Sequence, residues 1–591
     1  MSVSPVQRDL PMPVETPPVS LPDLTPPREL TLRAIVAGCG IGAVLAVGNV
    51  YMGLKTGWAD QGNITASLAG FAIFAFVRRV GRGGYSPLEN NITQTVASSA
   101  AGMSFTAGLV SAFPALSMMG QAFPFWAIGV WAVALGTAGV LIALLLRDRL
   151  LGVERLPFAS GIATAEVIEA LHRAARSALR RARALIGSGA AAMALVWFRD
   201  GQPALIPQVA AAPFQVSGVS AESLGFGINL SPLLLGTGLL IGPRNGVSLL
   251  LGTLVAWALL APLALHQRWV GSVDFSALSG WLLWPGVALM ASAALTSLFL
   301  RWETFGRGLK DLAELRPAKV GAGSPARYFW TAPVGLALVT IFVGWIAFGL
   351  HPLLTVVALL LSILLSSVCA RATGETDIAP VTQVGQLSQL SVGMLSPTVA
   401  GSVLSGAVVS GAAAQTAQTL WSLKAGALLG ANQRSVIRAQ LVGIAIGALV
   451  VVPAYQLVVR AYGLGSASLP APAAASWKGL AGLVHSGFKG LPSGALAAGG
   501  GALLVGVLLA LLERKIPSRF LPSAVAMGVG FLAPASYGLT IGLGAVLLGA
   551  ARAVNPRWAH TYSDAIASGT IAGESLLGVL IAVLLSLGVL S

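Results

Sequence analysis

Charged residues are scarce in this chain of 591 residues: they make up 10% of it, against roughly 25% in soluble globular domains. Hydrophobic residues make up 55%. A chain of this composition cannot present enough polar surface to water, which excludes a soluble globular protein. Five long apolar runs contain neither acidic residues nor lysine or arginine: Phe125–Leu146, Ser248–Leu265, Phe329–Leu350, Leu353–Cys369 and Leu576–Leu590.

Cysteine and histidine are also rare. Cys39 and Cys369 lie in apolar runs, where cysteine behaves as a small buried hydrophobic residue. The five histidines include no pair spaced i,i+4, so the sequence predicts no metal site. The chain also lacks the G-x-x-x-x-G-K-[ST] loop of ATP-binding proteins and the H-E-x-x-H and G-x-S-x-G motifs of hydrolases. We therefore expect no cofactor and no enzymatic activity.

The apolar runs match a lipid bilayer, whose core is crossed by about 20 helical residues. Backbone polar groups in lipid must be satisfied within the protein, so only helices or a closed barrel can span it. Barrel strands alternate apolar and polar residues over segments of about ten residues, whereas these runs are longer and uniformly apolar. We predict an all-α polytopic membrane protein with about 14–16 membrane segments, some of them too short to span.

The net charge of +15 comes mainly from loops between the apolar runs. Basic loops tend to stay on the cytoplasmic side, where they contact anionic lipid headgroups. We therefore expect a lipid bilayer, and no nucleic acid, as the partner of this charge. Arg28 and Arg33 precede the first span and favour a cytoplasmic N-terminus in the cell (inner) membrane.

Composition divides the chain into four expected parts. Residues 1–27 are rich in proline and are expected to form a disordered cytoplasmic tail. Residues 28–300 form a first membrane half and residues 328–591 a second one. Residues 301–327 between them form a basic cytoplasmic linker.

Two short words recur in the same order in both halves. Lys55 in the first half precedes Pro157 by 102 positions, and Lys424 in the second precedes Pro522 by 98. The order and spacing indicate two repeated halves, a common plan in transporters. Chance similarity is the alternative, because both words are short. The matched words are Gly53–Gly57 with Ser422–Gly426, and Glu154–Gly161 with Ser518–Ala524.

Basic loops flank the segment Leu156–Ala170 on both sides, at Arg147–Arg155 and Arg173–Arg183. A helix that crosses the membrane once cannot have both of its ends in the cytoplasm. We therefore predict that this segment is a short re-entrant one. Phe520–Ala551 is bracketed by basic residues in the same way.

Acidic residues inside apolar segments are the candidates for proton coupling. A charged side chain at the centre of a membrane helix costs about 2.5–3.5 kcal/mol or more, so it needs a partner or a task. Glu574 has small and apolar neighbours, and no lysine or arginine follows it; the alternative is a buried acid that caps a broken helix. Glu166, Glu375 and Asp377 complete the set. Their alternatives are a contact with a nearby cytoplasmic arginine and a charged loop at a helix end.

Lys55 and Lys424 are the matching cations of the two halves and the first candidates for substrate binding. They can bind a substrate carboxylate or pair with buried acids, and the alternative is that they extend to the membrane interface. Neutral hydrogen-bonding side chains within apolar segments complete the expected solute path, although each one can instead join two helices. These are Asn49, Tyr51, Gln94 and Gln415.

Several runs, spread from about residue 30 to the C-terminus, resemble the oligopeptide transporter (OPT) superfamily. They are Asn49–Trp58, Asn91–Ala100, Leu156–Glu166, Gly374–Pro380, Ser422–Gly426 and Phe520–Ala524 followed by Pro534–Tyr537. The resemblance implies proton-coupled uptake of small peptides or of metal-chelate, siderophore-like complexes. It is nearer to the yellow-stripe (metal-chelate) branch and its prokaryotic relatives than to the eukaryotic peptide branch. Tyr537, which ends the last run, joins the substrate-binding candidates.

Two other classes of function stay open. A passive channel for small polar solutes predicts a lumen open to both sides and uptake that is insensitive to an uncoupler. A membrane-embedded enzyme requires a nucleophile–base pair or a metal cluster. The expected partners are a small-molecule substrate, protons and the bilayer; many transporters dimerise, so a homodimer is also an open expectation.

Overall fold

The computed structural model describes residues 29–587 and 589, apart from 61, 78–83, 174, 202–203, 212, 301–325, 378, 488–490 and 518–519. The expected tail at 1–27 lies outside the described residues, as does nearly all of the expected linker at 301–327. The described chain is helical almost throughout, which confirms the predicted all-α class.

Ten helices of the described chain are long and apolar enough to cross a membrane. They confirm a polytopic membrane protein, while the count of 14–16 segments also includes shorter helices and stays a prediction. The ten are α1 (Leu32–Thr56), α5 (Phe125–Arg147) with the π-helical turn η1 (Asp148–Val153), α8 (Pro232–Thr253) with η2 (Leu254–Leu260) and α9 (Ala261–His266), α10 (Phe275–Leu300), α13 (Pro352–Thr376), α15 (Val399–Leu428), α16 (Gln433–Tyr462), α18 (Ala495–Leu512), α20 (Ala535–Val554) and α21 (Pro556–Ser586).

The remaining helices lie between and beside these spans. They are α2 (Asn63–Val77), α3 (Pro87–Thr106), α4 (Ala112–Ser117), α6 (Ala159–Arg173), α7 (Ala175–Asp200), α12 (Ala326–Phe348), α14 (Val381–Gly393), α17 (Pro472–Ser486) and α19 (Ala524–Leu532). Two small antiparallel pairs of strands lie between α7 and α8. In them β1 (Val209–Ala211) pairs with β4 (Gly227–Asn229), and β2 (Gln215–Val216) pairs with β3 (Val219–Ser220).

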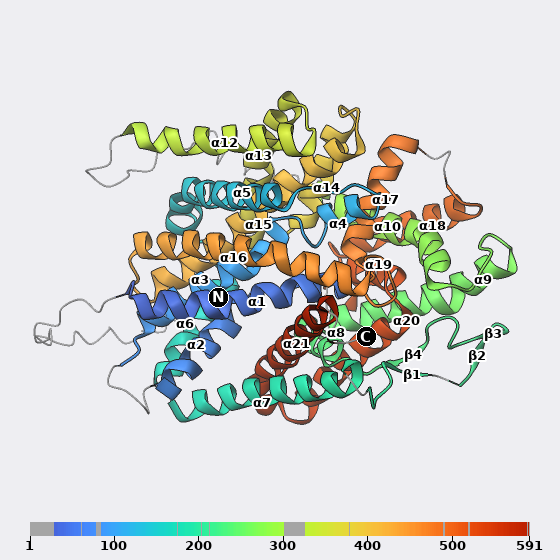
Figure 1. Ribbon diagram of the computed structural model, residues 1–591, viewed down its shortest axis with the longest axis horizontal. Coiled ribbons are helices and arrows are strands. Elements are labelled where there is room, and N and C mark those ends of the chain that lie inside the picture. The colour runs from blue at the N-terminus through green and yellow to red at the C-terminus, as the bar shows by residue number, and fades with distance from the viewer. Residues whose placement is uncertain are drawn as a thin grey trace, which may run out of the picture.

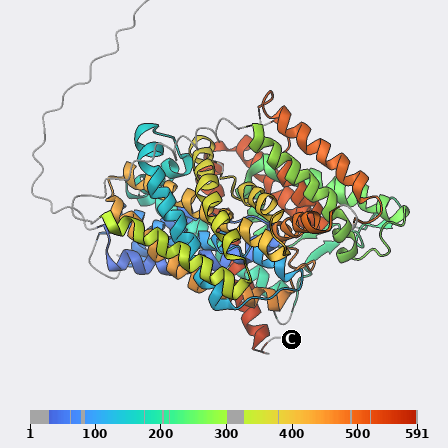
Figure 2. The same ribbon diagram turned by 90° about the horizontal axis from the view of Figure 1, so that it is seen from above.

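The helices pack into two groups. In the α3 group, α3 is packed by α1, α2, α15 and α16, with α5, α6, α12, α13 and α14 around them. In the α8 group, α8 is packed by α19, α20 and α21, with α7 against α21 and α10 against α18. Helices α1, α5, α12 and α16 run roughly parallel across Figure 1, and Figure 2 shows α10 and α18 side by side. Each group takes helices from both 28–300 and 328–591, so the two parts of the sequence interleave in space.

Glycine permits the closest helix crossings in the α8 group. A Cβ atom on Gly238 of α8 would lie 2.0 Å from the carbonyl oxygen of Ile541 on α20. A Cβ atom on Gly573 of α21 would lie 2.3 Å from the carbonyl oxygen of Gly189 on α7. Small residues at such crossings let helices approach within a membrane, where apolar burial alone does not drive association.

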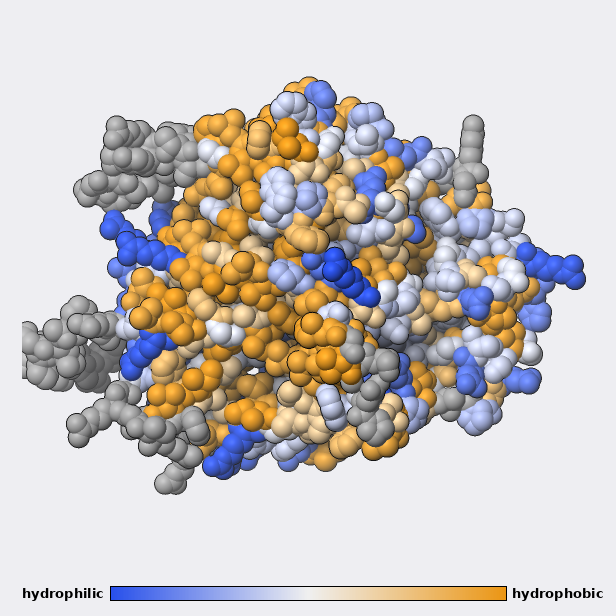
Figure 3. Space-filling model, in the orientation of Figure 1, coloured by the Kyte–Doolittle hydropathy of each residue, from blue (hydrophilic) through white to orange (hydrophobic). Residues whose placement is uncertain are grey.

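The outer surface of the bundle is apolar. Large hydrophobic side chains project outward from α12 and α18, among them Leu338, Trp345, Leu504 and Leu508. The face in Figure 3 is broadly hydrophobic, with strongly hydrophilic residues gathered mainly toward its left and right ends. This distribution suits a protein whose middle zone contacts lipid acyl chains.

Several helices are interrupted inside the bundle. In α8 the helical conformation breaks at Gly242 (φ 78°, ψ 172°), directly before Pro243. Helix α19 ends at Leu532, and α20 starts three residues later, after Pro534. Helix α6 starts directly after Phe158, which has a positive φ of 46°. Such breaks leave helix ends, with their unpaired backbone groups, inside the membrane region. The re-entrant path predicted for Leu156–Ala170 stays a prediction.

Candidate functional site

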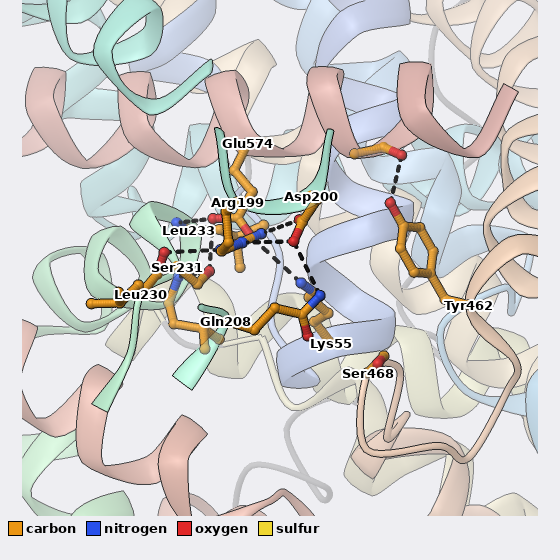
Figure 4. Close-up of polar contacts among 12 residues, drawn as sticks. Lys55, Arg199, Asp200, Gln208, Leu230, Ser231, Leu233, Tyr462, Ser468 and Glu574 are labelled. Atoms are coloured by element: carbon orange, nitrogen blue, oxygen red, sulfur yellow. Dashed lines mark hydrogen bonds and ion pairs between the residues drawn. The ribbon is translucent and has the colours of Figure 1, made fainter. Parts of the chain in front are cut away.

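Glu574, on α21, lies at the centre of a buried polar cluster (Figure 4). Its residue has no exposed surface. One carboxylate oxygen accepts hydrogen bonds from the Ser231 hydroxyl (2.7 Å) and the Leu233 backbone N–H (2.8 Å). The other accepts from Arg199 Nη2 (3.1 Å) and Lys55 Nζ (3.4 Å). The carboxylate therefore has four donors, two of them cationic.

Three helix ends meet at this carboxylate. Lys55 lies in the last turn of α1, Arg199 lies at the end of α7, and Ser231 is the N-cap of α8. A helix N-terminus favours an anion and a helix C-terminus favours a cation, so each charge sits at a favourable end. Arg199 also pairs with Asp200 at 2.5 Å. We call Lys55, Arg199, Asp200, Ser231 and Glu574 the Glu574 cluster; its two cations balance its two anions.

The ion pair between Lys55 and Glu574 joins the two helix groups, because α1 belongs to the α3 group and α21 to the α8 group. The Lys55 ammonium also lies over the ring of Tyr51, 4.7 Å from its centroid. Tyr51 is fully buried, and its hydroxyl has no hydrogen-bond partner among the described residues. The neighbouring Tyr462 differs, since its hydroxyl donates to the Gly578 carbonyl at 2.8 Å (Figure 4).

A cavity of about 320 Å³ adjoins this cluster. Gln208 lines the cavity and donates a hydrogen bond to Asp200 at 3.1 Å. Tyr537 lines it too, and its hydroxyl donates to the Ser468 carbonyl at 3.1 Å. The remaining wall combines aromatic rings with polar side chains: Phe226, Trp257 and Phe275 with Glu222, Ser223, Asn229 and Ser536. The side chain of Gln208 therefore connects the cavity to the buried charges of the Glu574 cluster.

A second polar cluster surrounds Asp377, the residue that ends α13 in a left-handed conformation (φ 60°). The Asp377 carboxylate accepts from the Ser160 N–H (2.9 Å), the Ser160 hydroxyl (2.6 Å) and the Trp421 indole N–H (2.8 Å). Ser160 lies in the first turn of α6, so this carboxylate also occupies a helix N-terminus. The end of α13 is fixed there by the Phe158 N–H, which donates to the Gly374 carbonyl at 3.1 Å.

Ion pairs continue from Asp377 along the end of α13. The buried Arg371 binds Glu154 at 2.6 Å and Glu375 at 3.3 Å. The Arg371 hydrogen bond holds the pKa of the Glu154 carboxyl below its usual value. Lys424, on α15, donates to the Leu156 carbonyl at 3.2 Å. We call Asp377, Ser160, Trp421, Arg371, Glu154, Glu375 and Lys424 the Asp377 cluster.

Gln94 and Gln415 lie between α3 and α15, in the interior of the α3 group. Gln415 uses both ends of its amide: Nε2 donates to Ser99 (3.0 Å), and Oε1 accepts from Thr106 (3.2 Å). Gln94 donates to Asn91 at 3.1 Å, but its carbonyl oxygen has no partner among the described residues. This fully buried interior therefore retains free hydrogen-bonding capacity.

Asn49 and Glu166, like Gln94 and Gln415, lie outside both clusters. The Asn49 amide holds the connection after α1: its Nδ2 donates to the Asp60 carbonyl (2.8 Å), and its Oδ1 accepts from the Asp60 N–H (3.1 Å). Glu166 is exposed on α6. The acid that pairs with Arg173 is Glu169, at 2.9 Å. The structure thus brings Lys55, Tyr51 and Glu574 together, and separately Glu375, Asp377 and Lys424.

The sequence reading missed Arg199, Asp200 and Ser231. A signal was present for each of them. Arg199 and Asp200 end an apolar stretch as a charged pair, and Ser231 before Pro232 is a typical start of a helix. Their convergence on Glu574 requires the packing of α7, α8 and α21, which local patterns do not reveal.

Charges buried at interrupted helix ends, beside a cavity and inside an apolar helical bundle, define the class of membrane transporters. Comparison with known families agrees. The family model for OPT oligopeptide transporter protein matches residues 29–585. The chain belongs to this family, which confirms the resemblance and the prediction of a transporter and not an enzyme.

Relatives match over nearly the whole chain. A protein of Haemophilus influenzae named for oligopeptide transport is 27% identical, covering 91% of this chain and 93% of its own. One of Saccharomyces cerevisiae, also named for oligopeptide transport, is 24% identical, covering 86% and 89%. The iron-phytosiderophore transporter yellow stripe 1 of Zea mays is 25% identical, covering 93% and 89%. The names of these relatives therefore include both peptide and metal-chelate transport.

Proposed function

We propose that this chain is a secondary-active, proton-coupled importer of small peptides or metal-chelate complexes in the cell (inner) membrane, with a cytoplasmic N-terminus. The observation that carries the proposal is the Glu574 cluster. It joins the two helix groups through one ion pair and adjoins a cavity. Transporters of this kind work by moving one bundle against another around a midplane site.

Peptides and many metal chelates carry carboxylates. Such a group entering from the cavity competes with Glu574 for Lys55 and Arg199, which exchanges the bond between the helix groups for a bond to the solute. Tyr51 and Tyr537 present aromatic and hydroxyl surface along this route, and Asn49, Gln94, Gln415 and Lys424 supply further polar groups within the α3 group. Glu574, Glu166, Glu375 and Asp377 are the acids proposed for proton coupling.

Uptake into liposomes that contain the purified protein tests this function. Short peptides, glutathione and iron–chelate complexes are screened with an inward pH gradient, with and without an uncoupler. We expect accumulation of one class, its loss with the uncoupler, and its loss in Glu574→Gln. The matched control is Glu169→Gln, which removes a partly exposed acid whose partner Arg173 lies on the surface. Uptake that is unchanged by the uncoupler would identify a passive channel.

A further inference from the structure

Asp60 lies in the connection between α1 and α2 and is held by neutral donors. One carboxylate oxygen accepts from the Thr65 hydroxyl at 2.7 Å, and the other accepts from the Gly62 N–H at 3.1 Å. Asn49 fixes the Asp60 backbone through both of its hydrogen-bonding groups. In the part of the chain that the structure describes, no lysine, arginine or histidine forms an ion pair with Asp60.

Two acids with less exposed surface than Asp60, Glu574 and Glu89, differ in this respect. Glu574 faces Lys55 and Arg199, and Glu89 pairs with Arg33 at 2.6 Å. A carboxylate that neutralises cations is needed in its charged form. A carboxyl group that meets only neutral donors can change its protonation without leaving a cation unpaired.

The charged group that acts on Asp60 from a neighbouring helix is Asp564, on α21. Burial raises the pKa of the Asp60 carboxyl above its usual value, and the Asp564 charge adds to the rise. Hydrogen bonds from Thr65 and Gly62 offset part of it. Helix α2 carries no titratable residue. None of the described cations on the helices packed around this connection forms an ion pair with Asp60. The described titratable groups on these helices are Arg33, Cys39, Tyr51 and Lys55 on α1; Glu89 on α3; Glu166, Glu169, His172 and Arg173 on α6; Arg180, Arg181, Arg183, Arg199 and Asp200 on α7; and Arg557, His560, Tyr562, Asp564 and Glu574 on α21.

Two hydroxyl groups connect Asp60 to α21. The Thr65 hydroxyl that donates to Asp60 lies 2.9 Å from the Ser568 hydroxyl. Ser568 is on α21, one turn after Asp564 and six residues before Glu574. When Asp60 gains a proton, its new O–H can donate to Thr65, and the Thr65 hydroxyl then turns to donate to Ser568. The protonation state of Asp60 is thereby transmitted to the helix that carries Glu574.

We propose that Asp60 binds the coupled proton and that the hydroxyl groups of Thr65 and Ser568 transmit its state to α21. This rests on the proposed proton-coupled function. The assignment separates the two tasks: Asp60 carries the proton, while Glu574 holds the two helix groups together through Lys55. Asp60 replaces Glu574, Glu166, Glu375 and Asp377 as the first candidate for this task. Like Asp377, it meets only neutral donors among the described residues, but its partner Thr65 also contacts Ser568 on the helix that carries Glu574.

Asp60→Asn tests the assignment in liposomes, with trialanine and iron(III)–nicotianamine as probes and a pH-sensitive dye inside. We expect proton-driven accumulation, and the acidification that accompanies it, to fall to background. Exchange of external labelled probe for internal unlabelled probe is expected to continue and to become independent of pH. Retained exchange also shows that the variant is folded and inserted. Accumulation driven by the pH gradient in Asp60→Asn would overturn the assignment.

Two further variants keep the test decisive if Asp60→Asn is poorly produced. Asp564→Asn removes the neighbouring exposed charge and should keep proton-driven uptake, with its pH midpoint lower by roughly a few tenths of a unit. Thr65→Val should slow proton-driven uptake more than it slows exchange. Equal slowing of both, or an unmoved midpoint in Asp564→Asn, contradicts the assignment. Wild-type uptake without proton dependence instead overturns the proposed function itself.

Discussion

The Glu574 cluster and the Asp377 cluster share a plan and differ in their cations. Each places a carboxylate at a helix N-terminus, on α8 or on α6, where a serine hydroxyl and a backbone N–H donate to it. Lys55 and Arg199 complete the surroundings of the fully buried Glu574. The partly exposed Asp377 receives the neutral Trp421 indole instead. The helix end provides the anion site, and the cations decide how strongly that site joins neighbouring helices.

The matching lysines show the same difference. Lys55 pairs with Glu574 across the boundary between the two helix groups. Lys424 donates to the Leu156 carbonyl, just before α6. Lys424, bonded to a carbonyl group, positions a chain segment. Lys55, paired with a carboxylate, neutralises a buried charge, and breaking that pair is costly.

The largest effect is expected from breaking the Lys55–Glu574 pair. Glu574→Gln leaves Arg199 paired with Asp200 and removes the acid that pairs with Lys55, so it should lower the free energy of unfolding by about 3–5 kcal/mol. Adding Lys55→Met restores the charge balance, so the double variant should lose less than the sum of the single losses, by about 1–3 kcal/mol. Unfolding of the purified protein, followed in one fixed lipid or detergent, measures this double-mutant cycle.

The same cycle on Asp377 and Lys424 is the matched control. Their losses should add within about 0.5 kcal/mol, because Lys424 contacts a carbonyl group and not Asp377. Equal coupling in both cycles would show that the two clusters do not differ as proposed.

Asp377→Asn by itself should have an intermediate effect, about 1–3 kcal/mol. The amide oxygen can still accept from the Ser160 N–H and the Trp421 indole, which share one carboxylate oxygen, but the amide nitrogen cannot accept from the Ser160 hydroxyl. Because no cation is left unpaired, transport should decrease less than in Glu574→Gln. A measurement of uptake rate and unfolding on the same preparations decides this order; a larger loss for Asp377→Asn reverses it.

Much of this fold could be predicted from composition. Long apolar runs predict membrane helices, because lipid leaves the backbone few other solutions. The interleaving of residues 28–300 with residues 328–591 could not be predicted, since it depends on close crossings such as Gly238 with Ile541, where one missing Cβ permits the approach.

The site was predictable only in part. Buried charge is costly, so Glu574 and Lys55 stood out from their apolar surroundings. Their partner Arg199 lies 375 positions before Glu574 and is identified only by packing. Asp60 stood among small and apolar residues in the sequence, but only the geometry shows that it meets Thr65 and Gly62 and, among the described side chains, no cation.

The ion pair between Arg371 and Glu154 should give stability a dependence on pH at the acid end. Since hydrogen bonding to Arg371 lowers the pKa of Glu154, this pair contributes stability above the ordinary carboxyl pKa. That contribution is lost as the pH falls through the lowered pKa. In Glu154→Gln, the free energy of unfolding should therefore fall less steeply as the pH is lowered into the acid range. Its slope against pH near neutrality should not change. An unchanged acid limb after the substitution contradicts the pairing.

The smallest change in stability is expected for Tyr51→Phe. The Tyr51 hydroxyl has no partner among the described residues, and the Lys55 ammonium contacts the ring, which phenylalanine retains. Stability should stay within about 0.5 kcal/mol of the wild type. If the hydroxyl binds the solute beside the Glu574 cluster, the KM for uptake should rise about fivefold, the value of one hydrogen bond. Tyr462→Phe is the opposite case: it removes a hydroxyl that donates to Gly578, so it should lower stability and leave KM unchanged. An unchanged KM in Tyr51→Phe would show that the Tyr51 hydroxyl does not bind the solute. The role of Tyr51 would then be limited to the contact of its ring with the Lys55 ammonium.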